Sequence, residues 1–161
     1  TELDLEGVAC LTELWCQQNK LNKLDLSEVP GLTKLVCNDN LLNDLDVEGV
    51  PGLTELWCHD NKLKKLDLSN VPELTMLYCD GNLLTELDLT CVPRLTELWC
   101  QQNKLTKLDL SNAPDLTELF CSDNQLNKIN LSSLNLLIAL LAKLSLLVLL
   151  YNNLILANAR N

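Results

Sequence analysis

The sequence is poor in aromatic residues, glycine and histidine. Aromatic side chains make up 4% of the 161 residues, there are five glycines, and His59 is the single histidine. Leucine dominates the apolar content, which suits a thin core made from one side-chain type repeated many times. A single histidine cannot supply a repeated Ser-His or Cys-His pair, and no nucleophile, base and orienting group recur together. We therefore expect no enzyme.

An excess of positive charge is also missing. The chain has 22 acidic and 12 basic residues, which gives a formal net charge of −10. Such a charge repels phosphate backbones and anionic lipid surfaces. We therefore do not expect nucleic acid as a partner.

The eight cysteines include no C-x-x-C pair from which a zinc site could start. Because a buried free cysteine behaves as a small hydrophobe, we predict reduced, buried thiols rather than disulfides, a redox centre or a metal site. Cys10 and Cys91 fall outside the regular spacing, at turn positions, and are the expected reactive thiols. No cofactor or metal is expected. The other six form a column at a spacing of 21 residues: Cys16, Cys37, Cys58, Cys79, Cys100 and Cys121.

This spacing belongs to an internal repeat. Residues 1–10 fit the last part of the same unit, so the chain begins inside a repeat, and we expect it to be a fragment or processed form of a longer protein. The unit reads L-T-x-L-x-C-x-x-N-x-L-x-x-L-D-L-S-x-V-P-x, and six full copies start at Leu11, Leu32, Leu53, Leu74, Leu95 and Leu116.

Two short stretches of each unit alternate between inward and outward positions, residues 14–16 and 24–26 in the first unit. The alternation predicts two strands per unit, and hence two parallel sheets. A unit of 21 residues cannot bury its own leucines, so neighbours must cover it at the interstrand spacing of about 4.8 Å. The predicted fold is a parallel β-solenoid. Its inward columns are represented in the first unit by Leu11, Leu14, Cys16, Asn19, Leu21, Leu24, Leu26 and Val29.

One of these inward columns is polar. An unpaired buried amide would cost about 1–3 kcal/mol, so we predict that the asparagines bond the backbone of the turn that follows the first strand. Proline marks the opposite turn, where its fixed φ and missing donor help to end the second strand. The asparagine column is Asn19, Asn40, Asn61, Asn82, Asn103 and Asn124.

The segment L-x-x-L-x-C-x-x-N-x-L resembles the signature of the leucine-rich repeat family, with Cys where that family usually has Leu. The 21-residue length with L-D-L-S and Pro is similar to the short repeats of bacterial internalin-like cell-surface proteins. The resemblance implies a horseshoe or right-handed superhelix on a bacterial surface or in a secreted protein. It also implies that a protein, or in some members a glycan, binds on the concave sheet.

The C-terminal segment departs from the repeat. Residues 134–156 are leucine-rich enough for a membrane helix, since about 20 apolar residues span a bilayer, but Lys143 near the middle argues against one. Leucines at 144, 147, 149 and 154, with Asn152, repeat the spacing of the first unit, so we predict a short helix at residues 133–143 and then a degenerate closing repeat. Contact with another subunit is the other interpretation. The chain thus divides into leucine-rich repeats at 1–136, comprising a half repeat plus six full units, and a capping segment at 137–161.

Outward positions of the first strands carry most of the variation between units and form our candidate site. The residue before the column cysteine is aromatic in five of the six units. An acid stands two residues earlier in four of the six units, and an amide or histidine stands directly after the cysteine in four of them. We predict ligand contacts from Trp15, Trp57, Tyr78, Trp99 and Phe120, from Glu13, Glu55 and Glu97, and from Gln17, His59 and Gln101.

Three interpretations of this aromatic stripe remain open. Cross-strand aromatic neighbours could simply stabilise the sheet. Solvent-facing Trp and Tyr, however, are typical of binding surfaces, which favours another protein as partner, within a larger chain or assembly. An extended glycan is the alternative, because the three Trp recur in every second turn, about 10 Å apart. Rings that lie flat and parallel would favour a glycan as ligand. Rings that interlock on edge would favour a protein.

The predicted second strands carry an outward column of acids that could suggest calcium. We favour a structural role, because lysines stand two residues earlier on the same face and no glycine-rich calcium loop is present. The acids are Asp25, Asp46, Asp67, Asp88 and Asp109, followed by Asn130, and the lysines are Lys23, Lys65, Lys107 and Lys128.

Overall fold

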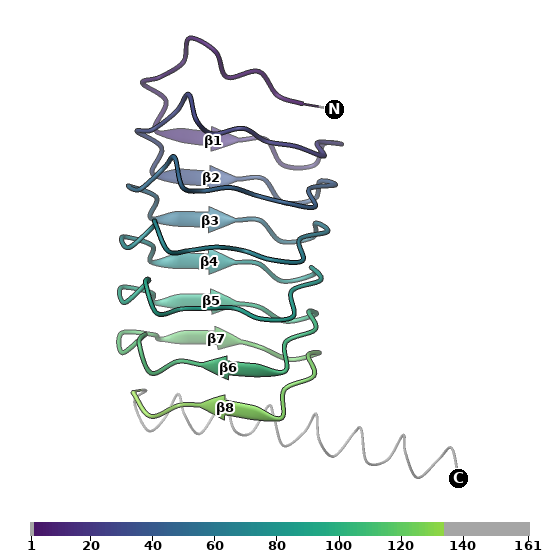
Figure 1. Cartoon of the computed structure of the whole chain (residues 1–161), viewed down its shortest axis with the longest axis vertical. Helices are drawn as coiled ribbons and strands as arrows, with labels where there is room; N and C mark the ends of the chain where they lie inside the picture. Colours follow the sequence, from purple (N-terminus) through teal and green to yellow (C-terminus); the bar gives the residue numbers. More distant parts are fainter. Residues whose placement is uncertain (1, 134–161) are drawn as a thin grey trace, which may run out of the picture.

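Successive turns of the chain stack along one axis (Figure 1). The computed structural model describes residues 2–133. Parallel strands pair in the order β1-β2-β3-β4-β5-β7, and each residue lies opposite the one 21 positions later, as Leu35 does with Leu56. The predicted parallel β-solenoid is confirmed. The strands of this six-stranded sheet are β1 (Glu13–Trp15), β2 (Lys34–Val36), β3 (Glu55–Trp57), β4 (Met76–Tyr78), β5 (Glu97–Trp99) and β7 (Glu118–Phe120).

The opposite side of the solenoid forms a sheet only near the C-terminal end of the described residues. There β6 (Lys107–Asp109) pairs in parallel with β8 (Lys128–Asn130). The prediction of a second strand in every unit is wrong for the earlier units, where the corresponding residues 23–26, 44–47, 65–68 and 86–89 are not strands. Alternation is kept, with Leu24 and Leu26 buried and Asp25 exposed. The alternation of buried and exposed residues indicates an extended backbone. It does not indicate whether neighbouring backbones lie close enough to form a ladder of hydrogen bonds.

The core is a set of leucine, cysteine and valine columns between the two sides. Leu35, Leu56, Leu77 and Leu98 are all fully buried, whereas Leu14 in the first unit keeps 9% of its surface exposed. Leu119 in the last unit is only partly buried. Burial therefore depends on a covering turn at each side, as expected for units that cannot bury their own leucines.

The asparagine column bonds the backbone as predicted. Asn61 donates from Nδ2 to the carbonyl oxygens of Cys37 (3.1 Å), Cys58 (3.2 Å) and His59 (3.2 Å), and its Oδ1 accepts from the N–H of Leu42 (2.9 Å). Cys37 and Leu42 belong to the preceding turn, so each asparagine joins two turns.

Asn19 is the exception to the predicted inward column, since it is exposed. It bonds only carbonyls of its own turn, those of Cys16 and Gln17. The half unit before it lacks the corresponding segment, so the first asparagine has no preceding turn to join.

The outward acids of the opposite side close local turns. Asp25 Oδ1 accepts from the N–H of Ser27 at 2.9 Å, and Asp67 Oδ1 does the same with Ser69 at 2.9 Å. These backbone hydrogen bonds, together with those of the serine side chains, lower the pKa of both carboxyl groups. Hydrogen bonds within the turn, rather than ion pairs with lysine, therefore account for this column.

The predicted C-terminal helix and closing repeat at 137–161 lie outside the described residues. Among residues 2–133, no helix is long and apolar enough to cross a membrane.

Candidate functional site

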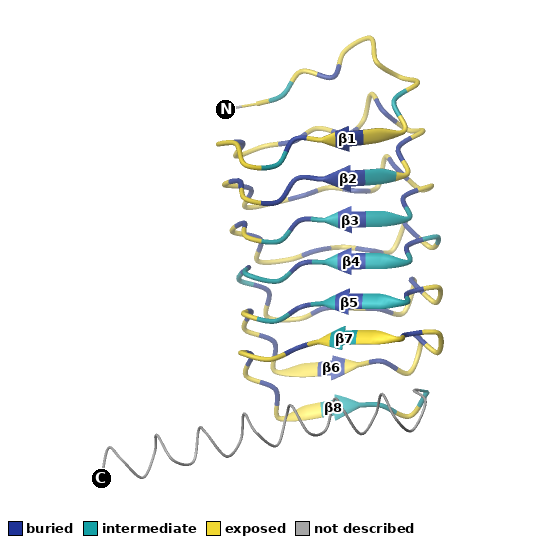
Figure 2. Cartoon of the chain, turned by 180° about the vertical axis from the view of Figure 1, so that it is seen from behind, coloured by how far each residue is buried: buried dark blue, intermediate teal, exposed yellow. Residues whose placement is uncertain are grey.

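Three columns of side chains cover the outer face of the six-stranded sheet. The first and third residue of each strand point outward, while the middle residue is buried in all but the last strand. The third column is formed by the residue that directly follows each of the six column cysteines. Exposure varies along the face, because β1 and β7 at the two ends are exposed and β3 to β5 are partly covered (Figure 2). All the predicted contact residues fall within these columns.

The aromatic stripe is a chain of rings in mutual contact. Ring centroids are 5.0 Å apart for Trp57 and Tyr78, 4.8 Å for Tyr78 and Trp99, and 4.9 Å for Trp99 and Phe120. The rings are tilted by 46°, 36° and 61°, respectively. Only the end rings are largely open, with Trp15 53% and Phe120 50% exposed. The three middle rings are only partly exposed, because neighbouring rings cover one another.

The aromatic stripe also covers the second unit, which has Val36 in place of an aromatic residue. Val36 is 2% exposed, and the rings of Trp15 and Trp57 approach to 6.5 Å above its strand. The Nζ atom of Lys34 lies 5.0 Å from one ring and 5.1 Å from the other. It also forms an ion pair with Glu55 at 2.6 Å. A cation thus occupies the interval between the two indoles, where cation–π attraction favours it.

The acids beside the stripe bond its rings. Glu13 accepts from Trp15 Nε1 at 3.2 Å, and Glu97 accepts from the hydroxyl of Tyr78. Burial, this hydrogen bond and neighbouring carboxylates raise the pKa of Tyr78 above its ordinary value. Glu13, Glu55 and Glu97 are therefore already engaged by Trp15, Lys34 and Tyr78.

Several polar atoms on this face lack a partner. Within residues 2–133, Nε1 of Trp57 and of Trp99, Nδ1 of His59, Oδ1 of Asp80 and Oε1 of Gln101 are shielded from solvent and make no hydrogen bond. Burial raises the pKa of Asp80, although the neighbouring His59 acts in the opposite direction. A buried polar group without a partner costs about 1–3 kcal/mol. Their concentration on one face, over β3 to β5, marks the centre of the sheet as the place where further partners can be gained.

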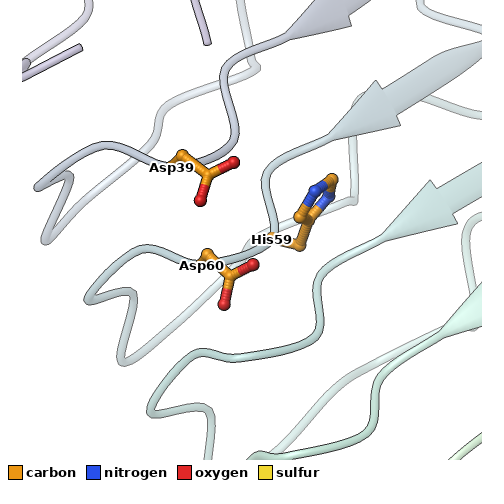
Figure 3. Close-up of side chains that lie close together, drawn as sticks. All are labelled: Asp39, His59 and Asp60. Atoms are coloured by element: carbon orange, nitrogen blue, oxygen red, sulfur yellow. The ribbon is translucent and has the colours of Figure 1, made fainter. Parts of the chain in front are cut away.

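Two acids join His59 at the edge of this face. Asp39 and Asp60 lie in the turns after β2 and β3, and the side chains of both extend toward His59 (Figure 3). One ligand atom from each of the three residues lies within 4.8 Å of the other two. His59 is partly buried, and the two acids are exposed.

Comparisons with known proteins agree with this architecture. No protein-family model matches the sequence, and no curated protein matches it significantly. A solved structure of the functional domain of InlJ from Listeria monocytogenes, described as including a cysteine ladder, is 39% identical with a TM-score of 0.64. The match covers 83% of this chain and 34% of that one. The chain is a leucine-rich-repeat solenoid of the internalin type.

More distant structures share the fold of this internalin-type solenoid. The internalin InlF of Listeria monocytogenes is 22% identical with a TM-score of 0.64, over 78% of this chain and 44% of that one. A leucine-rich repeat protein of Leptospira interrogans is 22% identical with a TM-score of 0.68, over 80% and 38%. The chain therefore spans less than half the length of each of these three proteins.

A cysteine ladder also runs through this internalin-type solenoid. The six column cysteines are buried, which confirms their predicted inward positions, whereas Cys10 and Cys91 are exposed. Burial raises the pKa of Cys16 and of Cys121 to about 11. The same cause raises the pKa of the central thiols, such as Cys79, further. The ladder thiols are therefore held as neutral core groups.

Sequence reasoning missed Lys34, Asp39, Asp60 and Asp80. Lys34 occupies a column that otherwise carries mostly glutamate, so this break in the pattern was the available signal. Asp39 and Asp60 adopt left-handed backbone, with φ of 53° and 52°. The recurrence of Asp, Gly and Gln at this position, 21 residues apart, was the signal for such a turn.

Proposed function

We propose that this internalin-type solenoid is a protein-binding module whose partner lies on the outer face of the six-stranded sheet. The observation that carries the proposal is the continuous stripe from Trp15 to Phe120, with polar groups on both sides. Trp and Tyr are enriched at the centres of protein interfaces. Partnerless polar atoms at Trp57 and Gln101 add donors and acceptors that a polypeptide could complete.

The ring geometry favours a protein over an extended glycan. A sugar-stacking platform needs rings that lie flat and are spaced to match sugar units, about 10 Å for alternate strands. Instead Trp15 and Trp57 are 6.5 Å apart and inclined at 53°. The surface is a row of ring edges and tilted faces, which suits the varied side chains of a protein.

We further propose that the chain works as part of a bacterial surface or secreted protein. The support is its likeness to InlJ over 83% of its length. Because the match covers 34% of that protein, the partner of the whole molecule is a separate question from the partner of this face.

The test compares the two sides of the solenoid. The parent is screened against immobilised candidate proteins and a glycan array, and each positive is measured with Trp57→Ala and with Asp67→Ala on the opposite side. Loss of a central hot spot should weaken binding by about 2 kcal/mol or more in Trp57→Ala. Asp67→Ala should bind like the parent.

A thermal melt of each variant separates lost binding from lost folding. Retained affinity in a folded Trp57→Ala variant would move the site off this face. Binding to glycans alone, with sensitivity to Trp57, would replace the protein partner by the glycan alternative.

A further inference from the structure

We propose that Asp39, His59 and Asp60 form a binding site for a divalent transition-metal ion of the zinc type. Their ligand atoms already lie within 4.8 Å of one another (Figure 3). Zinc binds imidazole nitrogen and carboxylate oxygen at about 2.0–2.2 Å, so small side-chain rotations would bring the three groups onto one ion. Two carboxylates balance the charge of the ion, and imidazole selects a transition metal over calcium or magnesium.

The backbone that carries these ligands is fixed by the neighbouring turns. The N–H of Asp39 donates to the carbonyl oxygen of His59 at 3.1 Å, and the N–H of Asp60 donates to that of Asp80 at 3.0 Å. Both acids hold left-handed φ values, 53° and 52°. Because all the ligands lie on hydrogen-bonded turns of a rigid stack, a metal would not have to order a loose loop.

Neighbouring residues also determine where the two carboxylates can lie. One oxygen of Asp39 accepts from Nδ2 of Asn38 at 2.7 Å, which leaves its other oxygen for an ion. Asp60 extends over Gly81, and a side chain at Gly81 would collide with this carboxylate. Gly81 takes the place in the next turn that Asp39 and Asp60 hold in theirs. The glycine thus ends the row of acids and makes room for the second carboxylate.

The histidine has a coordination position that the protein does not use. Its Nδ1 atom is shielded from solvent and has no hydrogen-bond partner among the described residues. Oδ1 of Asp80, in the same column one turn later, is likewise shielded and without a partner in residues 2–133. A cation would compensate for both deficits, by coordination of the imidazole and by attraction of the neighbouring carboxyl group. No other group of three such side chains in residues 2–133 converges in this way.

Zinc titration by isothermal calorimetry tests the site. The starting protein carries Cys10→Ser and Cys91→Ser, because exposed thiols also bind zinc and would obscure the result. We expect a single ion per chain. His59→Gln restores the residue found at this position in other units, and Asp60→Asn keeps the shape of the side chain. Each should weaken binding roughly tenfold or more, since even residues that only support metal ligands contribute that much.

Asp123→Asn is the matched control. Asp123 occupies the same turn position with φ of 51°, is exposed, and follows Ser122 rather than histidine. It should bind zinc like the starting protein, and zinc should shift the imidazole nitrogen resonances of His59. Absence of zinc binding at millimolar concentration would overturn the site, as would equal affinity in the starting protein and a folded His59→Gln variant.

Discussion

The two sides of the solenoid hold their backbone in different ways. From Thr12 to Leu21, the chain bonds the next turn: Cys16 N–H donates to Val36 O at 2.8 Å, and Leu21 N–H donates to Asn40 Oδ1 at 2.9 Å. From Asp25 to Leu32, it bonds itself, as when Val29 N–H donates to Leu26 O at 3.1 Å. The sheet side therefore couples the turns, whereas the opposite side, apart from the β6–β8 pair, completes each turn separately.

This difference predicts that the sheet side accounts for most of the folding cooperativity between turns. A change on the sheet side disturbs two turns at once, whereas a change in the local turns of the opposite side disturbs one. Nearest-neighbour coupling is what converts a row of individually unstable units into a stable array. The sheet side should consequently dominate stability, and the following variants test that expectation in order of decreasing effect.

Asn61→Leu should have the largest effect. It removes the amide bonds to Cys37, Cys58 and His59 and leaves Leu42 N–H unpaired. Each buried group left unpaired costs about 1–3 kcal/mol, so we expect a loss of about 3 kcal/mol or more in the free energy of unfolding. Urea denaturation followed by circular dichroism measures it. Asn19→Leu, at the exposed position that joins no preceding turn, is the control and should cost less than about 1 kcal/mol.

Trp99→Ala should have an intermediate effect. The ring packs between Tyr78 at 4.8 Å and Phe120 at 4.9 Å. Aromatic pairs contribute about 0.5–1.5 kcal/mol each beyond burial, so we expect a loss of about 1–3 kcal/mol by the same denaturation assay. Trp15→Ala, at the end of the stripe with its nearest ring 6.5 Å away, should lose less. Equal losses would mean that the rings do not stabilise one another.

Asp67→Ala should have a small effect. It removes the hydrogen bond to Ser69 N–H, which lies within a single exposed turn. Because the turn is exposed, water can replace this bond, and the loss of stability should be small. A loss as large as that of Asn61→Leu in parallel melts would contradict the division between the two sides.

The acid dependence of stability should be smaller still and should come from the opposite side. Hydrogen bonds lower the pKa of Asp67 below its ordinary value. A carboxyl group with a lowered pKa in the folded state contributes stability that is present above its unfolded pKa of about 3.9 and is lost as the pH falls through the folded value. Asp67→Asn should therefore make the free energy of unfolding less dependent on pH below 4. Unchanged pH dependence would show that the carboxylate is not stabilised by folding.

Most of the fold could be predicted from the periodicity of the sequence. The 21-residue spacing predicted the register of the six-stranded sheet directly. The polar column among the leucine columns predicted the backbone hydrogen bonds that Asn61 makes. The second strands were overpredicted because the alternation of Leu24, Asp25 and Leu26 describes the conformation of one segment. A ladder of hydrogen bonds depends on the distance between two neighbouring segments.

The candidate site was only partly predictable for a similar reason. Alternation placed Trp57 and His59 on the outer face, but not the lean of Trp15 and Trp57 over Val36 or the place of Lys34 between them. Those depend on side-chain rotamers and on a neighbouring turn of different composition. The approach of Asp39 and Asp60 to His59 depends on left-handed backbone at both acids, which the repeat pattern marks only faintly.

The Asn61 bonding pattern also makes length an evolvable property of the molecule. Each asparagine from Asn40 to Asn124 bonds its own turn and the turn before it, and its own turn offers the same positions to the asparagine of the turn after it. Removal or duplication of a complete unit therefore rejoins identical surfaces, whereas a gain or loss of one residue misplaces every later asparagine. Recombination between copies of the repeat within the gene can thus lengthen or shorten the outer face by whole strands, while the ladder beneath it closes as before.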